Sequence, residues 1–157
     1  MYWVGKLHYT LEWGEVAPSL SNYHLNIFRK RIYLVSDQSP DVLIVEDDVI
    51  LAQAYSEIIE GHGLTSELVP DGHTAVQRLA QIVPGMVILD LHLPGLSGVD
   101  VLQYMRQQAH LKHTMVIVLT ANAHLNDEIA GLVDRYFLKP IDFDDFNILI
   151  EAFASRD

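Results

Sequence analysis

The sequence has no cysteine, few basic residues and no long apolar run. Without cysteine the chain cannot form disulfides, thiolate metal sites, iron–sulfur clusters or a thiol nucleophile. Its 10 Lys and Arg face 21 Asp and Glu, and the formal net charge of -11 disfavours a large nucleic-acid footprint. No stretch approaches the ~20 apolar residues of a membrane span, and the first residues lack the pattern of a signal peptide. We therefore expect a cytoplasmic protein without membrane insertion or direct nucleic-acid contact.

Charge and aromatic residues divide the 157-residue chain near Ser39 and Pro40. Residues 1–40 hold four basic and three acidic side chains, which leaves six and 18, a net -12, for residues 41–157. Both tryptophans lie in the first 40 residues, and proline biases its predecessor away from helix. We predict an N-terminal extension of unknown role over 1–40 and a domain over 41–157. Residues 7–13 alternate like a strand, so the extension is either a docking arm or, as we favour, a segment with no fold of its own.

From residue 41 onward, short apolar runs alternate with segments of helical spacing. The runs 42–45 and 86–89 are apolar at every position, as in strands buried on both faces. Further strands are predicted at 66–69, 115–119 and 136–138, and helices around 49–59, 75–82, 97–109 and 142–155. This alternation predicts an α/β fold with a doubly wound five-stranded parallel sheet and helices on both faces.

Acidic side chains, a hydroxyl and a lysine follow the predicted strands at their carboxyl ends, where function gathers in such sheets. Crowded carboxylates repel one another and need a cation, and oxygen ligands suit Mg²⁺. A lysine and a hydroxyl beside the metal would bind a phosphoryl group, and an aspartate there could form an acyl phosphate. Each residue alone has a structural explanation, and Asp48 fits best as a helix N-cap. Their joint occurrence favours a phosphoryl-transfer site made of Glu46, Asp47, Asp90, Thr120 and Lys139.

Four segments, VLIVEDD, ILDLHLPGLSG, VLTANA and YFLKP, resemble the signature segments of the response-regulator receiver domain of two-component signalling. They occur in the family's order and the match spans essentially all of 41–157. The spacing of Asp90, Pro94 and Gly98 is specific in this setting. The resemblance implies a flavodoxin-like fold with strand order 2-1-3-4-5. It also implies a phosphoacceptor that receives its phosphoryl group in the presence of Mg²⁺.

The resemblance assigns a role to each matching residue. Asp90 would be the phosphoacceptor and a metal ligand. Asp47 would ligate Mg²⁺ directly and Glu46 largely through water. The remaining roles are a backbone carbonyl ligand at His92, a phosphoryl-binding lysine at Lys139 and a pair of switch residues at Thr120 and Tyr136.

Thr120 and Lys139 are 19 positions apart, which is short for this family and predicts a shortened fourth helix. The last predicted helix ends near residue 155, so we expect a stand-alone receiver that resembles the chemotaxis regulators. Its implied partners are a histidine kinase or histidine phosphotransfer protein, a downstream target protein and a second copy of the chain. We expect a signalling phosphoacceptor and not an enzyme, with at most self-phosphorylation from small donors and self-dephosphorylation.

Two alternatives belong to other classes. A receiver-like scaffold that is never phosphorylated would share the fold, although the acid pair, Asp90, Thr120 and Lys139 are all present. A phosphatase of the haloacid dehalogenase type also uses a strand-end aspartate, a threonine, a lysine and Mg²⁺. Such enzymes carry a second aspartate two residues after the first, where this chain has His92.

Overall fold

The structure is a computed structural model that describes residues 23–28, 31–36, 39–121 and 127–156. The strand predicted at residues 7–13 lies outside these residues. The chain divides into two compact units, residues 1–39 and 40–157, and the division falls one residue before the boundary predicted from composition. Among the residues that the structure describes, no helix has the length and apolar character needed to cross a bilayer.

The described part of the first unit is an antiparallel hairpin of β1 (Tyr23–Phe28) and β2 (Arg31–Ser36). Its register pairs Tyr23 with Ser36 and Phe28 with Arg31. This hairpin differs from our expectation of a segment with no fold of its own. A two-stranded hairpin is marginally stable by itself, which is why a short segment of this composition was not predicted to fold.

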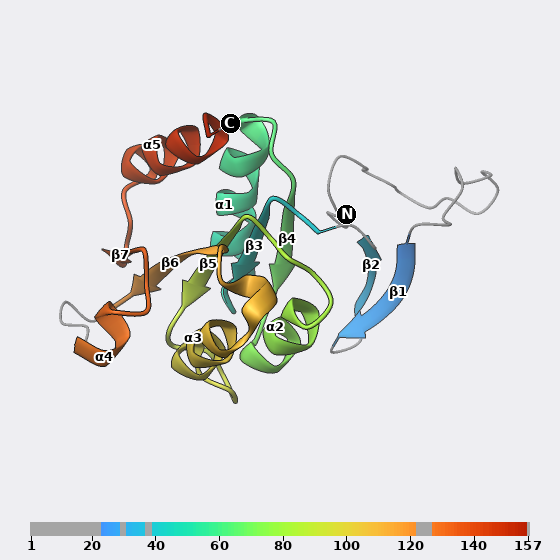
Figure 1. Ribbon diagram of the computed structural model, residues 1–157. Helices are drawn as coiled ribbons and strands as arrows, with labels where there is room; N and C mark the ends of the chain where they lie inside the picture. Colours follow the sequence, from blue (N-terminus) through green and yellow to red (C-terminus); the bar gives the residue numbers. More distant parts are fainter. Residues whose placement is uncertain (1–22, 29–30, 37–38, 122–126, 157) are drawn as a thin grey trace. The chain divides into compact units, whose positions relative to one another are not determined.

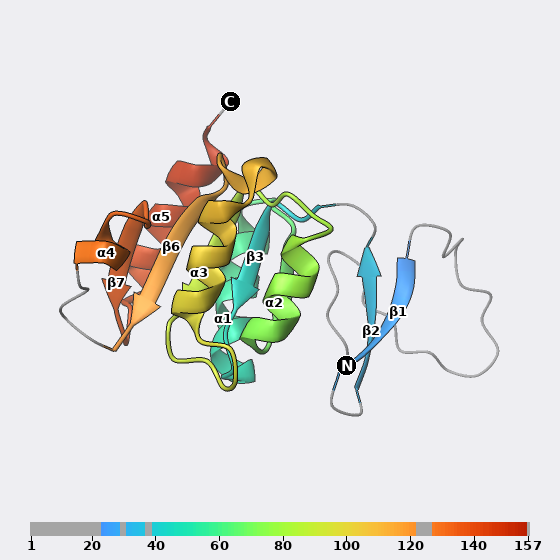
Figure 2. The ribbon, with the colours of Figure 1, turned by 60° about the horizontal axis from the view of Figure 1, so that its bottom comes forward.

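The second unit contains a five-stranded sheet in the order β4-β3-β5-β6-β7, and all four strand pairs are parallel (Figures 1 and 2). This is the predicted 2-1-3-4-5 order, with β3 and β5 as neighbouring interior strands. The carboxyl ends of the parallel strands lie along one edge of the sheet. The strands are β3 (Val42–Val45), β4 (Ser66–Val69), β5 (Met86–Asp90), β6 (Met115–Thr120) and β7 (Arg135–Leu138).

Helices cover both faces of this sheet, as predicted. In Figure 2, α2 and α3 lie in front of the strands, and α1 and α5 lie behind them. Within the described ranges, α4 spans four residues, Asp127–Ala130, which agrees with the shortened fourth helix. The helices are α1 (Val49–Gly61), α2 (Gly72–Leu79), α3 (Gly98–Gln107), α4 (Asp127–Ala130) and α5 (Phe143–Ala154), with a 3₁₀ turn, η1 (Ala109–Leu111), after α3.

The strand side chains alternate between two apolar cores. On β3, Leu43 and Val45 pack on the side of α2 and α3, and Val42 and Ile44 pack on the side of α1 and α5. All four are fully buried. Burial on both faces explains why these strands are apolar at every position and why their polar residues come only at the ends.

Gly98, the first residue of α3, lies directly against the end of β5. A Cβ atom at this position would overlap the carbonyl oxygen of Asp90 and lie 2.6 Å from the Cα of Leu91. We expect Gly98→Ala to lower the free energy of unfolding by about 1–3 kcal/mol, because both partners are backbone atoms that cannot give way. Gly61→Ala, whose Cβ would meet nothing within 4 Å, is the matched control. Urea unfolding measures both, and equal midpoints would contradict the expected close approach.

Candidate phosphoryl-transfer site

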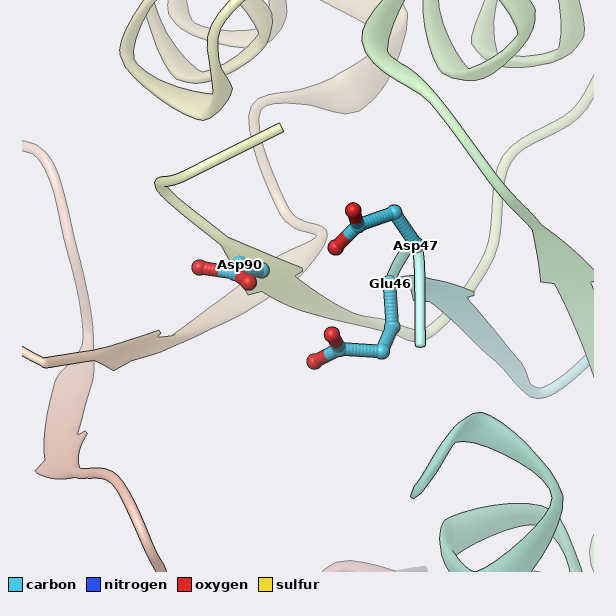
Figure 3. Close-up of side chains that lie close together, drawn as sticks. All are labelled: Glu46, Asp47 and Asp90. Carbon is cyan, nitrogen blue, oxygen red and sulfur yellow. The ribbon is translucent and has the colours of Figure 1, made fainter. Parts of the chain in front are cut away.

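Three carboxylates meet at the carboxyl edge of the sheet. Glu46 and Asp47 come directly after β3, and Asp90 is the last residue of β5. Each offers a carboxylate oxygen, and these oxygens all lie within 4.8 Å of one another. Figure 3 shows the carboxylates of Glu46 and Asp47 pointing toward the strand that carries Asp90. Glu46 and Asp90 are each only 4% exposed, whereas Asp47 is open to solvent.

Lys139, which directly follows the edge strand β7, bonds two of these carboxylates. Its Nζ donates to Oδ2 of Asp90 at 2.6 Å and to Oε2 of Glu46 at 2.7 Å. Its backbone N–H donates to the carbonyl oxygen of Thr120 at 2.8 Å, which fixes the residue beside the end of β6. The site therefore contains three carboxylates and one ammonium. Its excess of negative charge attracts a cation.

Burial and ion pairing act against each other on both partners. Burial lowers the pKa of Lys139, but its hydrogen bonds to Asp90 and Glu46 outweigh burial, so this pKa lies above its ordinary value. Burial raises the pKa of Glu46 above its ordinary value of 4.5, and the hydrogen bond and charge of Lys139 oppose this rise only in part. The folded structure thus favours the charged form of the lysine and disfavours the charged form of the glutamate.

We expect Glu46→Gln to stabilise the metal-free protein increasingly as the pH rises. A carboxyl with a raised pKa in the folded state binds its proton more tightly there. Its stabilising contribution is present below the unfolded value of about 4.5 and is lost as the pH rises through the folded pKa. Glutamine cannot titrate, so the difference in unfolding free energy between variant and wild type should grow from pH 5 to pH 8. Urea unfolding in chelator measures it, and a pH-independent difference would contradict the raised pKa.

The other predicted residues lie on or next to β5, β6 and β7 and differ in exposure. Thr120, the last residue of β6, is fully buried, and Tyr136 on β7 is 47% exposed. The backbone N–H of His92 donates to Oδ1 of Asp90 at 2.8 Å, and its exposed imidazole lies 3.9 Å from the same oxygen. Asp48 caps α1 by accepting from two backbone N–H groups, which confirms its structural role. The structure thus brings Glu46, Asp47, Asp90 and Lys139 into one cluster, with Thr120 and Tyr136 on the two strands beside it.

This donor set fits a hard divalent cation. All three candidate ligands supply carboxylate oxygens, one of them open to solvent, which suits the few protein ligands and retained waters of Mg²⁺. His92 does not share in this side-chain cluster. The side-chain geometry agrees with the sequence-based choice of Mg²⁺ over metals that prefer nitrogen or sulfur ligands.

One residue close enough to the acidic cluster to be affected by its charges was not identified from the sequence. Tyr55 on α1 is buried against Phe146 of α5, with ring centroids 4.6 Å apart. Burial, followed by the charges of Glu46, Asp90 and Asp48, raises the pKa of its hydroxyl. A single aromatic residue at a core position of an amphipathic helix carries no local signal that it lies near a charged site.

The chain belongs to the response regulator receiver domain family. The family model matches residues 42–151, which covers the five-stranded sheet and the acidic site. This finding confirms the family, the fold class and the role as a receiver domain of two-component signalling that the sequence predicted. It agrees with a signalling role.

Curated relatives and solved structures agree with this assignment. The response regulator PmrA of Pseudomonas aeruginosa is 35% identical over 118 residues, which are 73% of this chain and 52% of PmrA. The DNA-binding response regulator MtrA of Mycobacterium tuberculosis is 32% identical over 102 residues, 63% of this chain and 43% of MtrA. The chain thus spans about half the length of these relatives or less. MtrA is named as a DNA-binding protein, which conflicts with our prediction that this chain makes no direct nucleic-acid contact.

Two solved structures show the same fold. The receiver domain of a Francisella response regulator has a TM-score of 0.65 and 27% identity, and the match covers 75% of this chain and 98% of that one. The response regulator TrrA of Thermotoga maritima, solved in complex with Mg²⁺ and BeF, has a TM-score of 0.63 and 26% identity over 71% of this chain and 96% of TrrA.

Proposed function

We propose that this chain accepts a phosphoryl group on Asp90 from a histidine kinase or a histidine phosphotransfer protein. The observation that carries this proposal is the cluster in which Lys139 bonds Asp90 and Glu46 at 2.6 and 2.7 Å beside the exposed Asp47. An ammonium held on the acceptor carboxylate is placed to stabilise phosphoryl oxygens as they arrive. Asp90 is buried within the domain, at the carboxyl edge of the sheet. We therefore expect the donor to approach from the carboxyl ends of the strands.

The transfer needs one bond to form and one to break. A carboxylate oxygen of Asp90 attacks the phosphorus of a phosphohistidine, and the phosphorus–nitrogen bond breaks as the oxygen–phosphorus bond forms. The electron pair of the broken bond stays on the donor nitrogen, and because the other ring nitrogen of the phosphohistidine carries a proton, the ring leaves as neutral imidazole. Lys139 then exchanges its bond to the aspartate for one to a phosphoryl oxygen.

We assign Mg²⁺ to the acidic cluster, with Asp47 and Asp90 as direct ligands, Glu46 acting largely through water, and the backbone carbonyl of His92 as a further ligand. The bound TrrA structure, which holds Mg²⁺ with BeF, supports this assignment. When bound, Mg²⁺ would neutralise charge on the acceptor and on the phosphoryl oxygens. The backbone N–H of His92, bonded to Oδ1 of Asp90, holds the acceptor in place for the transfer.

Thr120 and Tyr136 form the switch in this proposal. The Thr120 hydroxyl would move to the phosphoryl group, and Tyr136, which is half exposed in this structure, would change its exposure with it. Phosphorylation thereby shifts an existing equilibrium between two surfaces. The readers of that surface would be a cytoplasmic target protein or a second copy of the chain, and small phosphoryl donors would allow slow self-phosphorylation.

Intact mass spectrometry after incubation with acetyl phosphate tests this proposal. We expect a single phosphoryl adduct that forms in the presence of Mg²⁺ and does not form when EDTA is present during the incubation. Hydroxylamine should remove the adduct, as it removes an acyl phosphate. Absence of an adduct from acetyl phosphate and from a panel of histidine kinases, with the fold intact by circular dichroism, would favour the unphosphorylated scaffold. Steady release of inorganic phosphate from phosphate monoesters would favour the phosphatase.

A further inference from the structure

Arg106, in the last turn of α3, reaches from its helix to the segment that leads into β7. Its Nε donates to the carbonyl oxygen of Leu132 at 2.7 Å, its Nη2 to Oδ2 of Asp134 at 3.1 Å and its Nη1 to the carbonyl oxygen of Thr114 at 3.4 Å. The same Oδ2 of Asp134 accepts from the backbone N–H of Val116 on β6 at 2.7 Å. We call Arg106, Asp134 and the Leu132 carbonyl the β7 clamp.

The clamp adds hydrogen bonds to the segment before a strand that lies at the edge of the sheet. β7 has four residues and lies at an edge of the sheet, paired only with β6. Two of its side chains, Tyr136 and Leu138, are each 47% exposed. The preceding helix α4 is described over Asp127–Ala130, and short helices depend on their surroundings. The clamp therefore fixes the position of β7 together with the ladder to β6, the bond from Asp134 N–H to the Val116 carbonyl and the core packing of Phe137.

Lys139 follows β7 directly, and its place in the site depends on that strand. The ammonium bonds Asp90 and Glu46 across the sheet, while its backbone is fixed by the ladder to β6 and by the bond from Lys139 N–H to Thr120. A shift of β7 along or away from β6 would move this ammonium with it. Misplacing a catalytic group by about 1 Å can cost up to ~10²-fold in rate.

The candidate metal ligands lie on or directly after strands other than β7. Glu46 and Asp47 follow β3 and Asp90 ends β5, two interior strands of the sheet. In the part of the chain that the structure describes, the hydrogen bonds of the clamp reach β6 and the segment before β7, and none reaches β3 or β5. Disturbing the clamp should therefore affect the lysine and spare the metal site.

We propose that Arg106 and Asp134 are positioning residues of the phosphoryl-transfer site, which they serve by holding β7 so that Lys139 stays on Asp90. The inference rests on the proposed function and adds to it two residues outside the site. Arg106 acts through backbone and carboxylate contacts and touches neither acceptor nor metal ligand. Its contribution is specific to the transfer step, which uses the lysine, and not to Mg²⁺ binding, which uses the carboxylates.

The test compares Arg106→Ala, Arg106→Lys and Asp134→Asn with the wild-type chain. We expect the initial rate of adduct formation from acetyl phosphate, at saturating Mg²⁺ and per folded molecule, to fall roughly 10- to 100-fold in Arg106→Ala. The Mg²⁺ affinity measured by calorimetry should stay within about twofold or become tighter, since a displaced ammonium competes less for the carboxylates. Arg106→Lys should recover part of the rate, because it keeps the charge on Asp134 without the forked contact. Asp134→Asn keeps an acceptor oxygen for Val116 and provides a milder variant should Arg106→Ala fold poorly.

Arg78→Ala is the matched control. Arg78 is buried, unlike the partly exposed Arg106, and makes a forked ion pair with Glu67, at 2.6 and 3.0 Å, at the opposite edge of the sheet. We expect it to lower stability in urea and to leave the rate per folded molecule unchanged. Wild-type rates in the clamp variants, or rates and Mg²⁺ affinity that fall in parallel, would overturn the inference alone. No adduct on the wild-type chain would overturn the proposed function and this inference with it.

Discussion

Asp90→Asn is expected to abolish the phosphoryl adduct, with a loss of at least about 10³-fold in the initial rate from acetyl phosphate. An amide has no carboxylate oxygen with which to attack phosphorus, and it removes one of the three charges that would hold Mg²⁺. The fold should persist, because Lys139 keeps its 2.7 Å bond to Glu46 and the crowding of carboxylates is reduced. Intact mass and a urea unfolding curve measure both effects.

Asp144→Asn is the control for this substitution, since Asp144 is an exposed aspartate in the first turn of α5. We expect it to form the adduct at the wild-type rate. An adduct of undiminished yield on Asp90→Asn would show a different acceptor. The exposed Asp47 would then be the first position to map by peptide mass spectrometry.

Lys139→Ala is expected to separate phosphoryl transfer from metal binding. Removing a preorganised cation from the acceptor should lower the rate of adduct formation by about 10²–10³-fold. The same change removes the ammonium that lies 2.6 and 2.7 Å from two of the carboxylates, so Mg²⁺ should bind roughly tenfold tighter. Calorimetry measures the affinity, because both tryptophans lie in the first 40 residues, outside the receiver domain.

Lys112→Ala, at an exposed position after η1, serves as the control for loss of one positive charge. It should change neither quantity by more than about twofold. A Lys139→Ala protein that transfers at the wild-type rate would contradict the role of the lysine. One that binds Mg²⁺ more weakly would show that the ammonium supports the metal site and does not compete with the ion.

The sheet and the acidic cluster could be predicted because their signals are local. The runs 42–45 and 86–89 are apolar at every position, and this pattern is typical of interior parallel strands. Once these strands are parallel, topology alone brings Glu46 and Asp90 to the same edge. The shortened fourth helix was also visible as a missing length of chain between Thr120 and Lys139.

The β7 clamp could not be predicted because its partners are distant in the sequence. Arg106 meets Leu132 and Asp134, which lie 26 and 28 positions away. A basic residue in the last turn of a helix is expected in any case from the helix dipole, so its type carried no further information. The hairpin of the first unit was missed for another reason, because its pairing links two short strands whose stability in isolation is marginal.

The two edges of the sheet have a consequence for association between chains. Each edge strand, β4 and β7, has only four residues and includes a charged one, Glu67 or Arg135. A proline follows each within two residues, Pro70 after Val69 and Pro140 after Lys139. Short, charged edges that end at proline are poor templates for strand addition. The domain can thus present its half-exposed Tyr136 and Leu138 to a partner without inviting the growth of its sheet into an aggregate.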